Sequence, residues 1–267
     1  MKRIKCTVVC LLFVLLWSCS TDKTNDDSAT IIDDNGNEQT VNVTENRKSV
    51  GTSAHDMLSQ ETFGSISFEI FYAANYKPTG ATVDNFKNFL SQIIHKPDGI
   101  TVSLKEINSP GKDVYSIEDI RAIEDSIRTT YNAEKNIAVF GLFLDGEYEE
   151  NTEEGSVLGI AYRNTSFVIF ENTIKEFSNQ PFAPSTTVLE STVLQHEFVH
   201  LLGLVNAGTT PQSDHQDTAH GRHCTSEDCL MYWTAETGEG LLNSLSGGSI
   251  PDLDSACLED LQANGGK

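Results

Sequence analysis

The pattern His196-Glu197-Phe198-Val199-His200 constrains this chain more than any other stretch of it. On an α-helix, residues four apart lie on one face, so both imidazoles can bind the same metal ion. Glu197 lies beside them, where a carboxylate can take a proton from an attacking water. The pattern therefore predicts a zinc helix with His196 and His200 as metal ligands and Glu197 as the general base.

The residues around the pattern favour a long helix. Ser185, Thr186 or Thr187 can cap its start, and Thr187-x-x-Glu190 has the form of a capping box. Apolar residues recur from position 188 to position 202, which predicts that the helix is buried along most of its length. Gly203 then allows the chain to leave the helix in a left-handed conformation.

The helix does not determine the third metal ligand. Three residues after Gly203 the chain has Asn206, whose uncharged amide oxygen is a weak zinc ligand. Better donors follow in the next stretch, and those that do not bind the metal can orient a ligating imidazole, bind another cation or lie in a solvated loop. These candidates are His215, Asp217, His220 and His223.

The stretch from His196 to Met231 resembles the archaemetzincins, a family of zinc peptidases of the metzincin type. It matches the first eight positions of H-E-x-x-H-x-x-G-x-x-H, and it contains the run His223-Cys224-x4-Cys229-x-Met231 after an inserted loop, 204–222. The resemblance implies that His223 is the third ligand, with His215 and Asp217 as alternatives, and that Met231 forms a Met-turn beneath one catalytic zinc ion. The family's further downstream cysteine pair is absent, since only Cys257 remains there.

The N-terminal residues predict export and lipid anchoring. A basic start at residues 1–5 precedes an apolar run, 7–17, that is too short for a transmembrane helix. Leu16-Trp17-Ser18-Cys19 then resembles a bacterial lipobox, although an ordinary signal peptide with a chance cysteine is the alternative. We expect a signal peptide over 1–18, a lipid-modified (palmitate) Cys19 and a flexible polar tether over 19–61. This places the protein in a bacterial cell envelope, at the periplasmic or surface face of the outer membrane.

The charge of the chain argues against nucleic acid as a partner. There are 39 acidic and 18 basic side chains, which gives a net charge of −21. A phosphate backbone would be repelled by such a protein, so we interpret the acidic clusters as a solvated surface. We expect a monomer that meets a peptide or protein substrate and the membrane.

Three cysteines remain once the signal peptide and Cys19 are set aside. Because an exported protein meets an oxidising compartment, we expect a disulfide between Cys224 and Cys229. Cys257 paired with one of these two is the main alternative, and Cys257 as a buried free thiol is another.

Hydrophobic periodicity predicts alternating strands and helices. The strands cover 65–73, 100–107, 137–144, 157–162 and 167–170, and the helices cover 82–95, 116–131, the zinc helix and 251–262. The resemblance implies an α+β metzincin-like domain over 62–264, with a twisted five-stranded mixed sheet and backing helices in an upper subdomain, 62–203. A small irregular lower subdomain, 204–264, carries the Met-turn and the final helix. Strand 157–162 is the expected edge, where Gly155 and Gly159 either admit a substrate backbone or serve a turn.

These observations predict a zinc peptidase that hydrolyses peptide bonds in proteins or peptides outside the cytoplasm. Tyr232 is a candidate donor to the oxyanion or, alternatively, a packed core side chain. The alternative function is a non-catalytic, metal-containing binding lipoprotein with a metzincin-like shell, and hydrolysis of a non-peptide amide is a third. Glu197 favours an enzyme, because a metal site that only binds needs no carboxylate next to its first histidine.

Overall fold

A five-stranded mixed sheet forms the centre of the structure, a computed structural model that describes residues 27–32, 38–152, 155–244 and 248–267. The strands lie in the order β4 (Gly99–Ile107), β3 (Ser65–Ala73), β6 (Asn136–Leu144), β9 (Ser166–Phe170) and β8 (Gly159–Arg163). The first four are parallel to their neighbours, whereas β8 is antiparallel to β9 and forms one edge. The predicted fold class is therefore confirmed, and each predicted strand is present within a few residues of its expected bounds.

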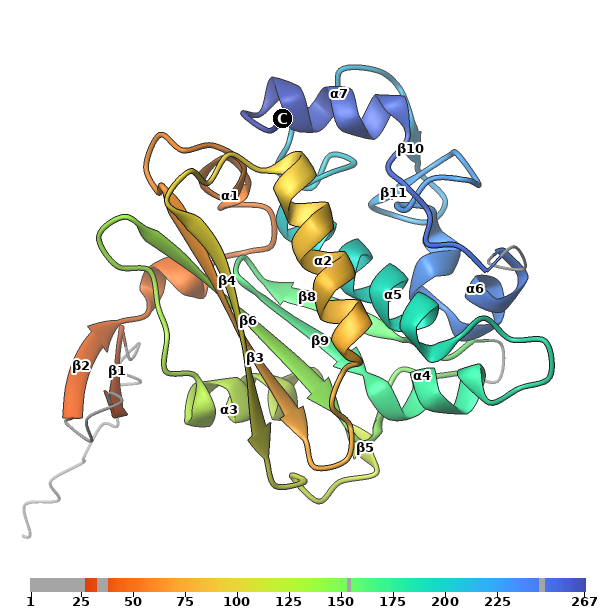
Figure 1. Ribbon diagram of the computed structural model, residues 1–267, viewed down its shortest axis with the longest axis horizontal. Helices are drawn as coiled ribbons and strands as arrows, with labels where there is room; N and C mark the ends of the chain where they lie inside the picture. Colours follow the sequence, from red (N-terminus) through yellow and green to blue (C-terminus); the bar gives the residue numbers. More distant parts are fainter. Residues whose placement is uncertain (1–26, 33–37, 153–154, 245–247) are drawn as a thin grey trace, which may run out of the picture.

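Helices cover both faces of this sheet (Figure 1). The helices α2 (Gly80–Ile93), α4 (Glu171–Ser178) and α5 (Thr186–Leu201) belong to the larger apolar core, and α3 (Ile117–Ile127) belongs to a smaller core. Side chains of β6 alternate between the two, with Val139 in the larger core and Phe140 in the smaller one. This alternation explains why β6 has a nearly continuous apolar sequence.

Shorter elements complete the fold. They are the hairpin of β1 (Ser28–Ile32) and β2 (Glu38–Asn42), α1 (Ala54–Leu58), the pair β5 (Val114–Tyr115) and β7 (Glu147–Tyr148), the pair β10 (Gln216–Asp217) and β11 (His223–Cys224), α6 (Gly238–Ser244), α7 (Ser255–Ala263), and 3-10 turns at Thr44–Asn46 and Trp233–Glu236. The sequence did not predict α1, α4, α6 or the hairpin. It placed the final helix too early, because Asp254 rather than Pro251 is next to its start and caps the Cys257 amide at 2.9 Å. Within the residues described, none of the helices has the length and apolar character needed to cross a membrane.

The end of the expected tether is part of the packed domain. Val43 and Asn46 are fully buried, and Met57 and Leu58 in α1 belong to the larger core. The Asn46 amide donates to the Ala138 carbonyl at 3.1 Å. The packed domain therefore begins well before residue 61. Single buried side chains and long-range hydrogen bonds hold this segment, and neither produces a local periodicity that the sequence could reveal. Residues 1–26, which include the expected signal peptide and Cys19, lie outside the described residues.

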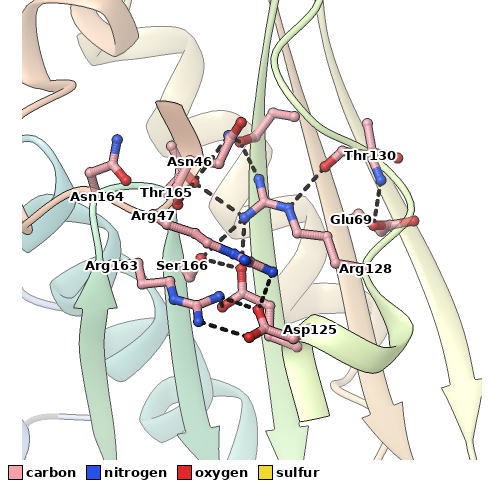
Figure 2. Close-up of polar contacts among 12 residues, drawn as sticks. Asn46, Arg47, Glu69, Asp125, Arg128, Thr130, Arg163, Asn164, Thr165 and Ser166 are labelled. Atoms are coloured by element: carbon pink, nitrogen blue, oxygen red, sulfur yellow. Dashed lines mark hydrogen bonds and ion pairs between the residues drawn. The ribbon is translucent and has the colours of Figure 1, made fainter. Parts of the chain in front are cut away.

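A buried polar network connects α3 with the strands β6, β9 and β8 (Figure 2). Arg128 pairs with Glu124 at 2.8 Å and also donates to the Ser166 hydroxyl at 3.2 Å. Arg163, at the end of β8, pairs with Asp125 at 2.7 Å. Because removal of one member leaves an uncompensated buried charge, this network holds α3 and the edge strand β8 in one arrangement.

Helix α5 passes through the protein rather than over its surface. Every side chain from Leu189 to Leu201 is buried, as predicted. Ser185 is the N-cap and accepts from the Val188 amide at 3.3 Å. The predicted capping box of Thr187 and Glu190 is not formed, since Glu190 reaches away to accept from the Thr79 amide at 2.9 Å.

We expect a Glu171→Gln substitution to stabilise the protein at neutral and alkaline pH. Glu171 is fully buried, and burial together with repulsion from the Glu190 carboxylate raises its pKa to about 10. A carboxyl group with a raised pKa stays protonated in the folded state, so its contribution to stability is lost as the pH rises from about 4.5 towards 10. Relative to the variant, the free energy of unfolding of the unmodified protein should fall by up to about 1.4 kcal/mol per pH unit.

Urea unfolding of both proteins between pH 5 and pH 9 measures this difference. Glu176→Gln, at an exposed position on the same helix, is the matched control and should show no such slope. Parallel pH profiles for Glu171→Gln and the unmodified protein would contradict the assignment.

Candidate metal centre

Helix α5 places His196, Glu197 and His200 in the interior, with exposed fractions of 0%, 1% and 7%. The two imidazoles lie one turn apart, and their Nε2 atoms are 3.1 Å from one another. Gly203 has a φ of 70° and ends the helix, as its sequence position predicted. The chain then returns to the helix through β11, which brings His223 to the same point.

Two of the three imidazole rings are oriented by backbone carbonyl groups. The Nδ1 atom of His196 donates to the Leu230 carbonyl at 2.7 Å, and that of His223 donates to the His220 carbonyl at 2.5 Å. A carbonyl can only accept, so each Nδ1 carries the proton and each Nε2 presents a lone pair to the centre. The ring centroid of His223 lies 5.3 Å from that of His196 and 5.2 Å from that of His200.

Glu236 is the fourth member of the group, and the sequence analysis did not identify it. Its Oε1 atom lies 2.9 Å from the Nε2 of His200, 3.1 Å from that of His223 and 3.5 Å from that of His196. It belongs to the 3-10 turn that follows Met231. A glutamate in an acidic chain gives no sequence signal of such a contact, because 36 residues separate it from His200.

The donor set fits a zinc ion. Lone pairs on several imidazole nitrogens that face one point repel each other, and a cation at that point removes the repulsion. Tetrahedral ligands about 2.0–2.1 Å from zinc lie about 3.3 Å from one another. The measured separations of 2.9–3.5 Å agree with this value, so His196, His200, His223 and Glu236 could hold the ion.

Glu197 lies next to this group but does not join it. Both of its carboxylate oxygens are buried and have no hydrogen-bond partner among the described residues. A Cβ atom at Gly159 would lie 2.7 Å from Glu197 Cγ, which is closer than real Cβ contacts. Gly159 is therefore needed so that α5 and the edge strand β8 can approach.

Burial and charge shift the titration of these groups in the metal-free protein. Burial lowers the pKa of His200 to about 4. Burial also raises the pKa of Glu197 well above its ordinary value, with repulsion from Glu236 adding to the effect. Burial acts in the same direction on Glu236, but the three neighbouring imidazoles, each of which can donate to it only when its Nε2 atom carries a proton, hold its pKa well below the usual range.

An open cleft leads to the centre. It has a volume of about 640 Å³, within the usual range for ligand sites, and β8 forms one wall through Gly159, Ile160 and Ala161. His220 also lines the cleft, and its ring stacks on Trp233 with a centroid separation of 4.4 Å. The centre is therefore accessible to a ligand that lies along the edge of the sheet.

The other candidate residues lie outside the centre. Asp217 pairs with His220 at 2.6 Å on the surface, and the Asn206 side chain contacts Gln216. Met231 is fully buried in the turn after Leu230, at the position expected for a Met-turn. Tyr232 lines a separate cavity with Glu227 and Asp228, so the structure does not bring it to the cleft as an oxyanion donor.

His215, the remaining candidate, belongs to a second group that could hold a metal ion. Its Nδ1 atom lies 3.5 Å from the sulfur of Cys224 and 3.9 Å from that of Cys257, and Cys257 lies 3.7 Å from Cys229. The residues that could share an ion are His215, Cys224, Asp254 and Cys257, whose ligand atoms all lie within 4.8 Å of one another, and Cys224 lies 3.2 Å from an Asp254 carboxylate oxygen. Asp260 accepts from the His215 Nε2 atom at 2.8 Å, which orients the ring as carboxylates do behind ligating histidines.

The cysteines are free thiols in this structure, so the predicted disulfide between Cys224 and Cys229 is not formed. All three are buried. Hydrogen bonds from the Cys224 and Cys257 thiols lower the pKa of Cys229 to about 4. A sulfur that is readily ionised and close to two others suits metal binding, and one catalytic zinc ion alone does not account for this second group.

No family model matches the chain, and no curated protein matches it. Among solved structures, it is similar to an archaemetzincin from Methanopyrus kandleri, with 17% identity over 75% of this chain and 96% of that chain and a TM-score of 0.49. It is also similar to a zinc-dependent peptidase from Methanocorpusculum labreanum, with 15% identity over 73% of this chain and 99% of that chain and a TM-score of 0.46. A third is metalloproteinase-II from Bacteroides fragilis, with 12% identity over 90% of this chain and 67% of that chain and a TM-score of 0.42. The identities and TM-scores are low, so the function proposed for this chain rests on its own site.

We expect two zinc ions per chain, and removal of one ligand from each group should separate them. His223→Ala and His215→Ala should each lower the zinc content from two to one, since each leaves the other donor set intact. Atomic emission on dialysed protein measures the ratio. Two zinc ions retained in His223→Ala would move the third ligand elsewhere, and one ion in both the unmodified protein and His215→Ala would show that the thiol group holds none.

Proposed function

We propose that this chain is a zinc-dependent peptidase that hydrolyses peptide bonds in proteins or peptides outside the cytoplasm. The observation that carries the proposal is the position of Glu197, a buried carboxylate next to three converging imidazoles and beside the edge strand β8. A group that only binds a metal would not need this carboxylate. His196, His200 and His223 would hold the zinc ion.

Bound zinc supplies Lewis-acid polarisation of a carbonyl group and favours the ionisation of water. The residues of this chain then provide orientation and proton transfer. A peptide laid along the edge of β8, as an added strand, brings its scissile bond over the centre. A carboxylate oxygen of Glu197 takes a proton from the attacking water and delivers it to the leaving amine.

The burial of Glu197 suits this role. Its oxygens have no hydrogen-bond partner in the described part of the chain, so they are available to a water molecule. The contact with Gly159 also fixes the position of the carboxylate relative to the strand on which a substrate would lie.

A non-catalytic metal-binding protein is the second candidate function. One observation favours it: Glu236 completes a set of four protein donors, and closed four-ligand sites are typical of structural zinc. Glu197 argues in the opposite direction, because it contacts none of these donors in a structural role.

Replacement of the proposed base tests the two functions. We expect Glu197→Gln to keep its zinc and to lower kcat for a quenched peptide substrate by about 10²–10⁴-fold, since the amide cannot accept the proton. Glu176→Gln, on the surface of α4, is the control and should keep both zinc and activity. Hydrolysis by Glu197→Gln at the unmodified rate would exclude this residue as the base, and zinc without hydrolysis in the unmodified protein would favour the binding function.

We also propose that the chain is anchored in a bacterial cell envelope through a lipid on Cys19. The proposal rests on the lipobox Leu16-Trp17-Ser18-Cys19 and on the polar stretch that follows. Metabolic labelling with an alkynyl fatty acid should mark the unmodified protein and leave Cys19→Ala unlabelled and in the soluble fraction. Equal labelling of both proteins would contradict the anchor.

A further inference from the structure

Glu236 belongs to the metal centre but has no part in the proposed reaction. Its Oε1 atom faces the Nε2 atoms of His196, His200 and His223 at 3.5, 2.9 and 3.1 Å. A reactive zinc site keeps one position open for water or substrate. This carboxylate oxygen lies where such a position would be expected.

Hydrogen bonding alone does not account for the position of this oxygen. The Nδ1 atoms of His196 and His223 donate to carbonyl groups at 2.7 and 2.5 Å, so in the neutral rings their Nε2 atoms carry no proton to donate to Glu236. The Nε2 atoms of His196 and His200 also face each other at 3.1 Å. The Nε2 atom of His200 can donate to Glu236 Oε1 at 2.9 Å, but that one proton leaves the lone pairs of His196 and His223 facing the same oxygen. A cation between the four atoms removes this repulsion.

The four atoms have the spacing of a complete tetrahedral shell. Four of their six separations, the three from Glu236 Oε1 and the one between His196 and His200, lie between 2.9 and 3.5 Å, beside about 3.3 Å for ligands around zinc. Three neutral imidazoles and one carboxylate leave a zinc ion with a net charge of about +1, which is a usual balance for a protein-bound ion. Glu236 therefore matches a ligand in both distance and charge.

The backbone holds Glu236 at this position from outside the histidine cluster. The Leu158 amide donates to the Glu236 carbonyl at 3.0 Å, and the Gly238 amide donates to the Ser156 carbonyl at 3.0 Å. Val157 and Thr237 form an isolated β-bridge between these two bonds. The segment that carries Glu236 is thus paired with the residues that lead into the edge strand β8, the strand along which a peptide would bind.

We propose that Glu236 is the fourth zinc ligand of the resting protein and that the site opens only when an incoming ligand displaces its carboxylate. This inference rests on the proposed zinc centre and concerns its regulation. About one-third of the Glu236 side chain is exposed, and it lines the open cleft, so the carboxylate can move into solvent without unfolding the centre. The resting protein is therefore latent without a separate inhibitory segment.

Cobalt(II) in place of zinc gives a readout that does not depend on hydrolysis, because its visible d–d bands report the ligands around the ion. Acetohydroxamate, a small chelating anion, would reach only the centre that is open to the cleft, so the bands that respond to it belong to that centre. Two quantities are measured at these bands: the affinity for acetohydroxamate, and the affinity for cobalt in competition with EDTA.

We expect Glu236→Gln to change these affinities in opposite directions. Loss of a ligand should weaken cobalt binding at least about 10-fold. Acetohydroxamate should bind at least about 10-fold more tightly, since it no longer displaces a carboxylate. Glu236→Asp keeps the charge but is too short to reach the ion, so it should behave as Glu236→Gln does. Glu150→Gln removes a carboxylate from the rim of the same cleft and should leave both affinities unchanged.

The proposal is overturned if Glu236→Gln and the unmodified protein agree within about twofold in both affinities. It is also overturned if Glu236→Asp resembles the unmodified protein, if Glu150→Gln reproduces the effect, or if the unmodified protein binds no metal at this centre. These results are independent of activity. Opposite shifts in the two affinities, together with a complete lack of peptide hydrolysis by every form, would support the closed centre and reject the peptidase function.

Discussion

The convergence of three imidazole nitrogens on one buried point is the constraint on which the site depends. Helix α5 supplies two of the rings and β11 supplies the third. Two of the rings are held from the side that faces away from this point. His196 and His223 donate their Nδ1 protons to the carbonyls of Leu230 and His220. These hydrogen bonds position the histidines and, equally, the loop after α5 and the turn before Met231. Metal binding is therefore coupled to the folding of this part of the chain.

Burial of α5 on all sides determines the rest of the architecture. An apolar helix with a polar pattern at its centre needs cover on every face, and the sheet, α2 and α4 supply most of it. Phe198, two residues before His200, packs with its ring centroid 5.3 Å from that of Phe68 in β3 and 5.5 Å from that of Phe86 in α2. The metal-binding residues are therefore rigid because the opposite face of their helix is part of the main core.

The sequence predicted what depends on local periodicity and failed where distant residues meet. The strands of the sheet and the zinc helix have strong apolar patterns, so they were predicted within a few residues. Glu236 was missed because its contact with the histidines is long-range, and the role of Asn46 was missed for the same reason. His215 was considered as a ligand of the catalytic ion, as a residue that orients such a ligand and as part of a site for another cation, but not as a neighbour of Cys224 and Cys257, to which the fold brings it. The disulfide was expected from compartment and spacing, neither of which shows that a third sulfur and an imidazole lie beside the pair.

The contact between Gly159 and Glu197 has a consequence for the variety of substrates such a cleft can accept. Because a side chain at position 159 would collide with Glu197, the wall formed by β8 offers only backbone at this position, next to the proposed base. Discrimination between substrate side chains then depends on the other residues that line the cleft, among them Ser49, Val50 and Arg222. Those residues lie outside the sheet and the zinc helix, so selectivity can diverge there by mutation while the catalytic geometry is preserved.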